Sequence, residues 1–224
     1  MTGDVLTRQL LAESVARLDP ATVAAERWFG GKGAAIERIV LAHAFVLPSI
    51  ARGSEPVDAV LAAVDVQAGG RRPERYLVPL VAAPGTVRPA DPGDGAWLAL
   101  ARAIAEGRTL PALPPGPAPG TTGTVEAALV CRPAPGFGAL LPEGPRAVAT
   151  FGERALGADQ SNTSTVLGER LLLKGYRRLW PGLSPDLELA AYLAEEVRFP
   201  GVPRLAGWAE LVTRDDEVTT VAML

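Results

Sequence analysis

Three apolar segments in the first ninety residues constrain the fold of this chain more than any other feature. They are IERIVLAHAFVLP (36–48), PVDAVLAAVDVQA (56–68) and ERYLVPLVAA (74–83), each rich in Val, Ile and Leu. Segments of this kind, bounded by Gly or Pro, are typical of strands, and the short turns between them favour antiparallel pairing. The sequence therefore predicts an antiparallel sheet that ends near residue 88.

Two helices are expected around this sheet. Before it, apolar side chains recur at the spacing of one helix face, at Val5, Leu6, Leu10, Leu11, Val15 and Leu18. The pair Asp19-Pro20 closes that pattern, and the helix needs the sheet to pack on. After the sheet, the segment 95–106 predicts a second helix, with Asp94 as its N-cap and Gly107 as its stop.

A proline- and glycine-rich loop (109–123) leads into a second set of elements. Strands are predicted within 124–133, 146–156, 164–176, 205–214 and 216–224. A further helix is predicted over 184–197, because Ser184 suits an N-cap and Pro185 suits the first helical position. The whole chain is therefore expected to be an α+β protein.

The composition excludes several classes of function. The chain has 224 residues, 48% of them hydrophobic, and a net charge of -3, so it lacks the basic excess that nucleic acid or anionic lipid would attract. A single cysteine, Cys131, and a single histidine, His43, provide neither a disulfide nor a zinc site. No segment approaches the ~20 apolar residues of a membrane span, and the N-terminus has no signal-peptide core. We therefore expect a cytoplasmic protein without nucleic-acid or membrane partners.

Several residues that attract attention have ordinary structural interpretations. His43 is expected to be a half-buried structural histidine, and Cys131 a small core residue. Glu153 and Glu169 are interpreted as solvated charges. None of these residues is predicted to carry chemistry.

The glycine cluster RWFGGKGAA (27–35) resembles a nucleotide loop only superficially. It lacks the G-x-x-x-x-G-K-[ST] spacing, and no apolar strand precedes it. We expect a tight turn in which Trp28 and Phe29 anchor the first helix on the sheet.

A possible nucleotide site begins at QSNTS (160–164), whose small hydroxyl and amide side chains suit a phosphate-binding turn. The following strand ends on Lys174, and its alternation places Lys174 on the face opposite Leu173. A lysine on an apolar strand needs a counter-charge, which Glu188 in the next helix would supply. Protein kinases hold ATP phosphates with such a pair. A lysine in solvent and a turn without phosphate are the alternatives.

Three stretches together resemble the bacterial maltokinases, which phosphorylate maltose at its anomeric hydroxyl with ATP and whose lower half is similar to aminoglycoside phosphotransferases. They are ERWFGGKG (26–33), the block 157–193 from GADQSNTS to PDLELAAYL, and FPGVPRLAG (199–207). The resemblance implies an N-terminal cap subdomain over 1–90. It implies that 91–224 is an intermediate subdomain that corresponds to a kinase N-lobe and ends at the hinge.

The resemblance also implies a set of site residues. Lys174 would bind the α- and β-phosphates of ATP, and Glu188 would orient that lysine. The phosphate loop would consist of Ser161, Asn162, Thr163 and Ser164. Adenine would lie against Val166 and Leu172 and beside Met223 of the hinge segment VAML (221–224).

The resemblance leaves parts of a kinase unassigned. The substrate aspartate and the Mg²⁺ ligands of such enzymes lie on a C-lobe, which is absent from this sequence, so no metal ligand is assigned here. We expect these 224 residues to bind ATP weakly and to turn over nothing by themselves. A full-length enzyme would make maltose 1-phosphate for glycogen and α-glucan synthesis, and association or fusion with a trehalose-converting enzyme is compatible with this.

Three alternatives stay open. The acceptor would be another sugar, an amino sugar or an aminoglycoside in the first. In the second, the chain is a non-catalytic binding or regulatory module, a pseudokinase fragment. In the third, it is a structural domain in which Lys174 faces solvent.

Overall fold

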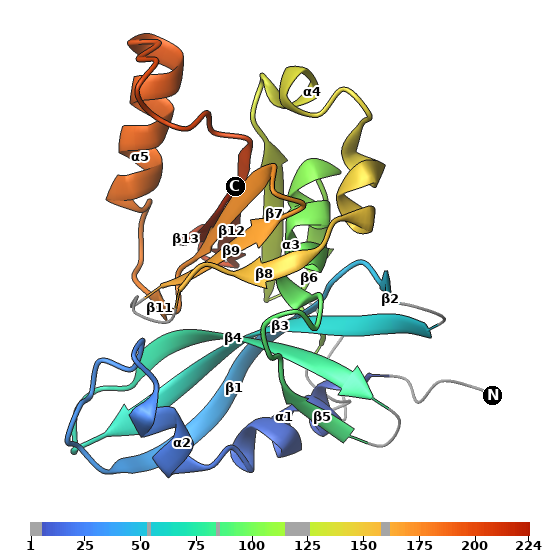
Figure 1. The fold of residues 1–224 in the computed structure, drawn as a ribbon. Helices are drawn as coiled ribbons and strands as arrows, with labels where there is room; N and C mark the ends of the chain where they lie inside the picture. The colour runs from blue at the N-terminus through green and yellow to red at the C-terminus, as the bar shows by residue number, and fades with distance from the viewer. Residues whose placement is uncertain (1–5, 53–54, 84–85, 115–125, 158–161) are drawn as a thin grey trace.

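The fold consists of two antiparallel sheets, one above the other in Figure 1. The computed structural model describes residues 6–52, 55–83, 86–114, 126–157 and 162–224. The N-terminal sheet forms the lower half of the view, and a seven-stranded sheet forms the upper half with α3 (Ala96–Ala105) and α5 (Pro185–Ala191) beside it. The expected α+β class, with two antiparallel sheets and accompanying helices, is confirmed.

The N-terminal sheet contains the three predicted strands in their predicted order. They are β1 (Ile36–Val46), β3 (Glu55–Ala68) and β4 (Glu74–Ala83), each antiparallel to the next. Two short strands extend it, β2 (Ile50–Arg52) on β3 and β5 (Thr86–Pro89) on β4. The apolar segments therefore predicted this sheet correctly.

The central strand β3 is buried on both faces. Val60, Ala62 and Val64 pack with the first helix on one side of the sheet. Ala59, Leu61 and Ala63 join the core that contains α3 on the other side. Burial on both faces explains why the strand reads as an almost continuous apolar run rather than an alternating one.

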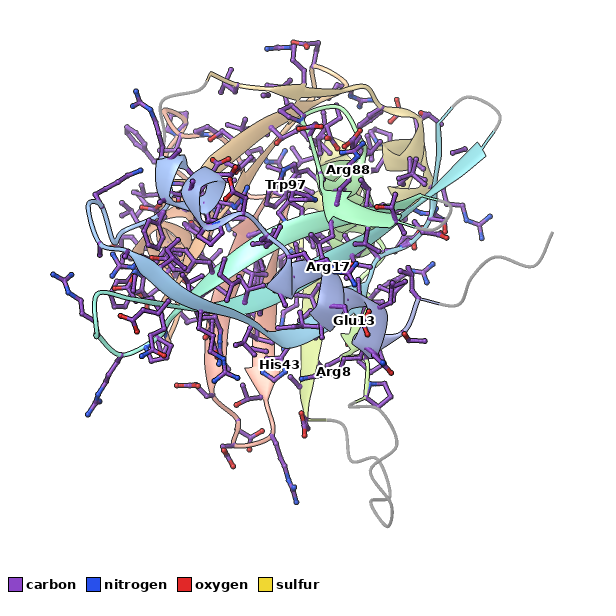
Figure 2. The ribbon with its side chains drawn as sticks, turned by 90° about the horizontal axis from the view of Figure 1, so that it is seen from below. Arg8, Glu13, Arg17, His43, Arg88 and Trp97 are labelled. Atoms are coloured by element: carbon purple, nitrogen blue, oxygen red, sulfur yellow. The ribbon has the colours of Figure 1, made fainter. Side chains whose placement is uncertain are left out.

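The N-terminal helix is shorter than its apolar pattern suggested. α1 (Arg8–Ala16) buries Leu11 and Val15 completely, and Figure 2 shows its labelled Arg8, Glu13 and Arg17 across the outer side of the sheet. Asp19 then begins a second helix, α2 (Pro20–Ala25), by accepting hydrogen bonds from two backbone N–H groups. The Asp-Pro pair thus separates two helices. Val5 lies outside the described residues.

The start of α3 corrects two expectations. The N-cap position of this helix is occupied by Gly95 rather than Asp94, whose carboxylate accepts a hydrogen bond from Arg88 at 2.6 Å. The carboxylate of Glu153 accepts from the N–H groups of Gly93, Gly95 and Leu98 at 3.0, 3.3 and 2.9 Å. A carboxylate at a helix N-terminus satisfies donors that have no partner within the helix. Glu153 is therefore a helix cap rather than a solvated charge.

The end of α3 is as predicted. Gly107 has a φ of 64°, in the left-handed region that favours glycine after the last helical turn. The helix packs its buried side chains between the two sheets.

The seven-stranded sheet is antiparallel throughout. In spatial order it consists of β6 (Thr109–Pro111), β7 (Ala127–Pro133), β12 (Gly207–Thr213), β13 (Val218–Met223), β10 (Leu171–Gly175), β9 (Thr163–Leu167) and β8 (Glu153–Ala155). The short helix α4 (Phe137–Leu140) follows β7. The predicted strand over 146–156 was mostly wrong, because Pro145–Thr150 forms a 3₁₀ helix and only β8 joins the sheet.

The last helix begins where predicted and ends differently. Ser184 occupies the N-cap position and Pro185 the first helical position of α5. After Ala191 the helix continues as a π-helical turn over Tyr192–Glu196. Leu187 is the residue that α5 buries, against Ala134 and Leu205.

A two-residue strand joins the two sheets. β11 (Arg178–Leu179) follows β10 directly and pairs antiparallel with Tyr76 and Arg75 of β4. The later part of the chain therefore completes the edge of the N-terminal sheet. The domain boundary at residue 90 stays a prediction.

The single cysteine and histidine have the expected environments. Cys131 is 3% exposed, and burial raises the pKa of its thiol to about 12. His43 is half-buried on β1, and burial together with the charges of Arg75 and Arg8 lowers its pKa. Figure 2 labels His43 and Arg8 near each other. Neither residue belongs to the site described next.

Candidate functional site

One face of the seven-stranded sheet brings together five of the residues predicted for a nucleotide site. On β10, Lys174 lies opposite Ser164 of β9 on one side and Met223 of β13 on the other. Leu172 lies opposite Val166 in the next row of the same face. Directly opposed residues of antiparallel strands project to the same side of a sheet. We call the face with these five side chains the open face.

The alternate residues of the same strands form the packed face, which joins the core around α3. Leu173 is 0% exposed there. Gly175 lies so close to Trp97 of α3 that a Cβ atom at this glycine would be 2.5 Å from the indole ring. A glycine at this position is therefore explained by the tryptophan that fills the space.

Lys174 is held by the helix that follows it. Its Nζ donates a hydrogen bond to Oδ2 of Asp186 and lies 5.5 Å from the centre of the Tyr176 ring. The Tyr176 hydroxyl lies 3.5 Å from the same carboxylate and 3.4 Å from the sulfur of Met223. Burial raises the pKa of Tyr176, and the negative charge of Asp186 contributes to that rise. The four side chains form one compact group.

The partner of Lys174 is therefore Asp186 rather than Glu188, which corrects the expectation from the sequence. Successive residues of an α-helix are 100° apart, so these two acids, two positions apart, project in nearly opposite directions. Leu187 between them is 5% exposed, Asp186 projects to the side on which it accepts the hydrogen bond from Lys174, and Glu188 is exposed. A role for Glu188 stays a prediction.

The apolar residues of the open face differ in their exposure. Leu172 is 46% exposed and Val166 is half-buried, so this pair is accessible beside Lys174. Met223 instead packs with Trp208 beneath α5, against the cluster that contains Leu187. The open face is thus covered by α5 at one end and accessible at the other.

The predicted phosphate turn is described only in part. Ser161 lies outside the described residues, while Asn162 and Thr163 are half-buried. Ser164 shares the open face with Lys174, whereas Thr163 lies opposite Gly175 and so projects to the other side. The Thr163 hydroxyl accepts a hydrogen bond of 3.4 Å from Arg177.

The turn between β9 and β10 gives the hairpin its shape. The N–H of Arg170 donates to the carbonyl of Leu167 at 3.1 Å, and both Gly168 and Glu169 have positive φ. Positive φ at both central residues matches the twist of the flanking strands. The Gly-Glu corner therefore fixes the register that aligns Ser164 with Lys174.

Sequence reasoning missed three residues of this region. Asp186 was available as a first-turn acid of the predicted helix, but only its hydrogen bond with Lys174 in the structure distinguishes it from Glu188. Nothing about a tyrosine at position 176 indicated that it would lie beside Lys174 and Asp186. Arg177 follows the lysine strand, and its contacts lie in distant parts of the chain.

Two observations bear on metal and membrane binding within the part of the chain that the structure describes. No three His, Cys, Asp or Glu side chains there cluster as metal ligands. No helix in those ranges is both long and apolar enough to cross a bilayer.

Two comparisons with known proteins agree with this architecture. Residues 23–108 match the family model described as the maltokinase N-terminal cap domain. A solved structure of a glucosamine kinase (crystal form B) superposes with a TM-score of 0.51 at 22% sequence identity. The alignment covers 95% of this chain and 38% of the glucosamine kinase chain, so the shared fold corresponds to little more than a third of that protein.

The two comparisons complement each other. The cap match lies in the N-terminal sheet, α3 and the segments around them, while the structural similarity extends over nearly the whole chain. The family match identifies the type of domain at residues 23–108, and the solved structure, at 22% identity, shows that the fold is shared. The resemblance of residues 23–108 to the maltokinase N-terminal cap domain is therefore confirmed, and the fold of the chain as a whole is that of the N-terminal portion of a sugar kinase structure.

Proposed function

We propose that this chain is the nucleotide-binding, cap-bearing part of an ATP-dependent sugar kinase that phosphorylates maltose to maltose 1-phosphate. The observation that carries the proposal is the position of Lys174 on the open face, paired with an acid of α5 and aligned with Ser164. A strand lysine held by a helix acid is the arrangement by which kinases bind nucleotide phosphates.

The residues present suit ATP in their chemistry. The accessible Leu172 and the half-buried Val166 offer an apolar surface for adenine. Lys174 would neutralise charge on the α- and β-phosphates, with hydroxyl and backbone donors of Asn162–Ser164 near them. ATP supplies the phosphoryl group, whereas these residues hold and orient it.

Asp186 has two roles in this proposal. It holds Lys174 in place while the ammonium group has no phosphate partner, and it keeps the lysine on the open face as α5 packs through Leu187. Because the pair is only partly buried, with side-chain exposures of 27% and 50%, the attraction is weak enough for an anionic ligand to compete.

The remaining parts of the reaction would come from elsewhere in a longer protein. The substrate aspartate and the Mg²⁺ ligands of kinases lie outside the portion that corresponds to an N-lobe. This chain spans 38% of the length of the glucosamine kinase with which it shares its fold. We propose that these 224 residues bind nucleotide without turnover.

Maltose is the proposed acceptor because the cap domain is of the maltokinase type. Glucosamine is the second candidate, because the structural relative is a glucosamine kinase. The full-length protein should release ADP in a panel of maltose, glucose, glucosamine and kanamycin, and the preferred acceptor decides between them.

The nucleotide site can be tested with a selective probe, because Lys32 and Lys174 are the only lysines in the sequence. Reductive methylation with ¹³C-formaldehyde gives each lysine its own NMR signal. Lys32 donates to backbone carbonyls at the C-terminal end of α2 and serves as an internal control. Titration with ATP should shift the Lys174 signal and leave the Lys32 signal in place.

The matched variants are Lys174→Met and Lys32→Met. Loss of a charge-assisted contact should weaken ATP binding by about tenfold or more in the first variant and leave it unchanged in the second. Equal affinity of Lys174→Met and the unsubstituted protein would support the non-catalytic alternatives instead.

A further inference from the structure

The N-terminal cap is connected to the candidate nucleotide site through the motif RWFGGKG (27–33). Trp28 and Phe29 are buried, at 9% and 2% exposure, and their rings lie 5.3 and 5.7 Å from the ring of Tyr76 on β4. The Tyr76 hydroxyl donates to Glu74 at 2.5 Å and accepts from the N–H of Gly30 at 3.1 Å. The motif therefore packs on the edge of the N-terminal sheet that β11 completes.

Two arginines that follow the lysine strand enter this cluster. Arg178 donates to the second oxygen of Glu74 at 2.5 Å. Arg177 is bound to Leu77 of β4 twice, by its Nε to the carbonyl at 2.8 Å and by its own carbonyl, which accepts from the Leu77 N–H at 2.7 Å. Its guanidinium also lies 4.6 Å from the centre of the Trp28 ring. The plane of this guanidinium is therefore fixed by the cap.

The other end of the same guanidinium reaches the candidate phosphate turn. Nη1 of Arg177 donates to the hydroxyl of Thr163 at 3.4 Å. Thr163 is the first residue of β9, and its neighbour Ser164 lies opposite Lys174. One side chain thus contacts a cap aromatic ring, a cap strand and the residue that begins the nucleotide strand.

We infer that Arg177 is a positioning residue through which the cap sets Asn162–Ser164 relative to Lys174. The inference rests on the proposed function, because it assumes that these residues face nucleotide phosphates. Burial lowers the pKa of Arg177 to about 10, so the group stays charged at neutral pH and keeps both its hydrogen bonds and its contact with the Trp28 ring. The cap then contributes to nucleotide binding without touching the nucleotide.

The effect of substituting Arg177 on ligand binding should depend on whether the ligand carries phosphate groups. Arg177 bears on the phosphate end of the site, whereas Val166 and Leu172 at the adenine end lie on other parts of the strands. Arg177→Met should weaken ATP and ADP binding by about two- to tenfold, the value of one or two hydrogen bonds, and leave adenosine binding unchanged. Arg177→Lys keeps the charge but loses the planar fork, so it should restore the affinity only in part.

The experiment titrates the 224-residue chain with adenosine, ADP and ATP and follows the methylated Lys174 signal. Trp28→Leu tests the cap side of the contact and should reproduce the phosphate-dependent loss. Arg170→Met is the control, since Arg170 pairs with Glu143 at the far end of the same hairpin. Thermal unfolding of each variant identifies any that fail to fold, and Arg177→Lys then carries the comparison.

The outcomes separate the two hypotheses. If the unsubstituted chain binds none of the three ligands, the proposed function fails, and this inference fails with it. If it binds ATP and ADP but Arg177→Met and Trp28→Leu bind all three ligands as before, or lose adenosine equally, the cap does not position the turn and only this inference is overturned.

Discussion

The two faces of the seven-stranded sheet place opposite demands on neighbouring residues of one strand. On the packed face of β10, Leu173 is fully buried and Gly175 is pressed against Trp97. On the open face, Leu172 is 46% exposed, and Lys174 is partly exposed beside Asp186. Because side chains alternate along a strand, the five residues of β10 contribute to the core on one face and to the candidate site on the other. Stability and ligand binding should therefore respond to different substitutions.

The largest expected effect compares two adjacent leucines. Leu173→Ala should reduce the free energy of unfolding by about 2–5 kcal/mol, because it leaves a cavity in the core. Leu172→Ala should change it by less than about 0.5 kcal/mol, because that side chain lies on the open face with 46% of it exposed, yet weaken adenosine binding. Denaturant unfolding and nucleotide titration of both variants measure the difference. Similar losses of stability would show that the two faces are not independent.

The next effect tests the close approach on the packed face. Gly175→Ala should cost about 1–3 kcal/mol of stability, because the added methyl group would overlap the Trp97 ring. Trp97→Phe in the same chain makes room, so the double variant should lose less than the sum of the single variants. Additive losses in this double-mutant cycle would place the cause of the Gly175 effect elsewhere.

The elements that the sequence predicted well are those with long local patterns. The three apolar strands were recognisable because each is longer than its turns and bounded by Gly or Pro. The start of α5 was recognisable because Ser184 and Pro185 suit its first positions whatever lies around them. Local chemistry determines such features.

The missed features depend on the tertiary structure. Glu153 caps α3 from 55 positions away, and nothing near Leu98 in the sequence indicates it. The choice between Asp186 and Glu188 follows from which way α5 turns when Leu187 packs on the sheet. β11 has only two residues, so its pattern is too short to recognise. The sequence predicted that Lys174 and Ser164 share one site, whereas it did not predict that Asp186 is the acid that pairs with Lys174.

The pH dependence of stability offers a third test on the packed face. Burial raises the pKa of Cys131 to about 12 from its ordinary value of 9.0, so the thiol ionises in the unfolded chain before it does in the folded one. The buried, protonated thiol therefore leaves the free energy of unfolding unchanged below pH 9 and reduces it as the pH rises from 9 toward 12. At about pH 10 the loss should be about 1 kcal/mol.

The measurement for this test is denaturant unfolding between about pH 8 and 10, compared with Cys131→Ala. The variant should show a shallower decline over that range. Burial also raises the pKa of Tyr76, from 10.0 to about 12, so Tyr76 lowers the stability mainly above pH 10.0. This loss of stability is the same in the variant and in the unsubstituted protein. Identical slopes would mean that the thiol is accessible to water in solution.

The smallest effect concerns the open face. Asp186→Asn should reduce stability by less than about 1 kcal/mol, because its ion pair with Lys174 is half exposed. It should weaken ATP binding about two- to threefold, whereas Glu188→Gln should change neither quantity. Isothermal titration and thermal unfolding decide between them. A larger loss of affinity in Glu188→Gln would return the lysine-orienting role to Glu188 in the nucleotide-bound protein.

The pairing of β11 with β4 limits how the N-terminal cap could be exchanged in a chimaeric protein. A strand contributed by the later half of the chain closes the edge of the N-terminal sheet, with Arg178 of that strand bound to Glu74 and the preceding Arg177 bound to Leu77. The N-terminal cap is therefore not a self-contained unit that could be exchanged by itself. A chimaera that borrows a cap from a related protein should need the donor's counterparts of residues 177–179 as well, since the recipient's own residues would meet a foreign edge.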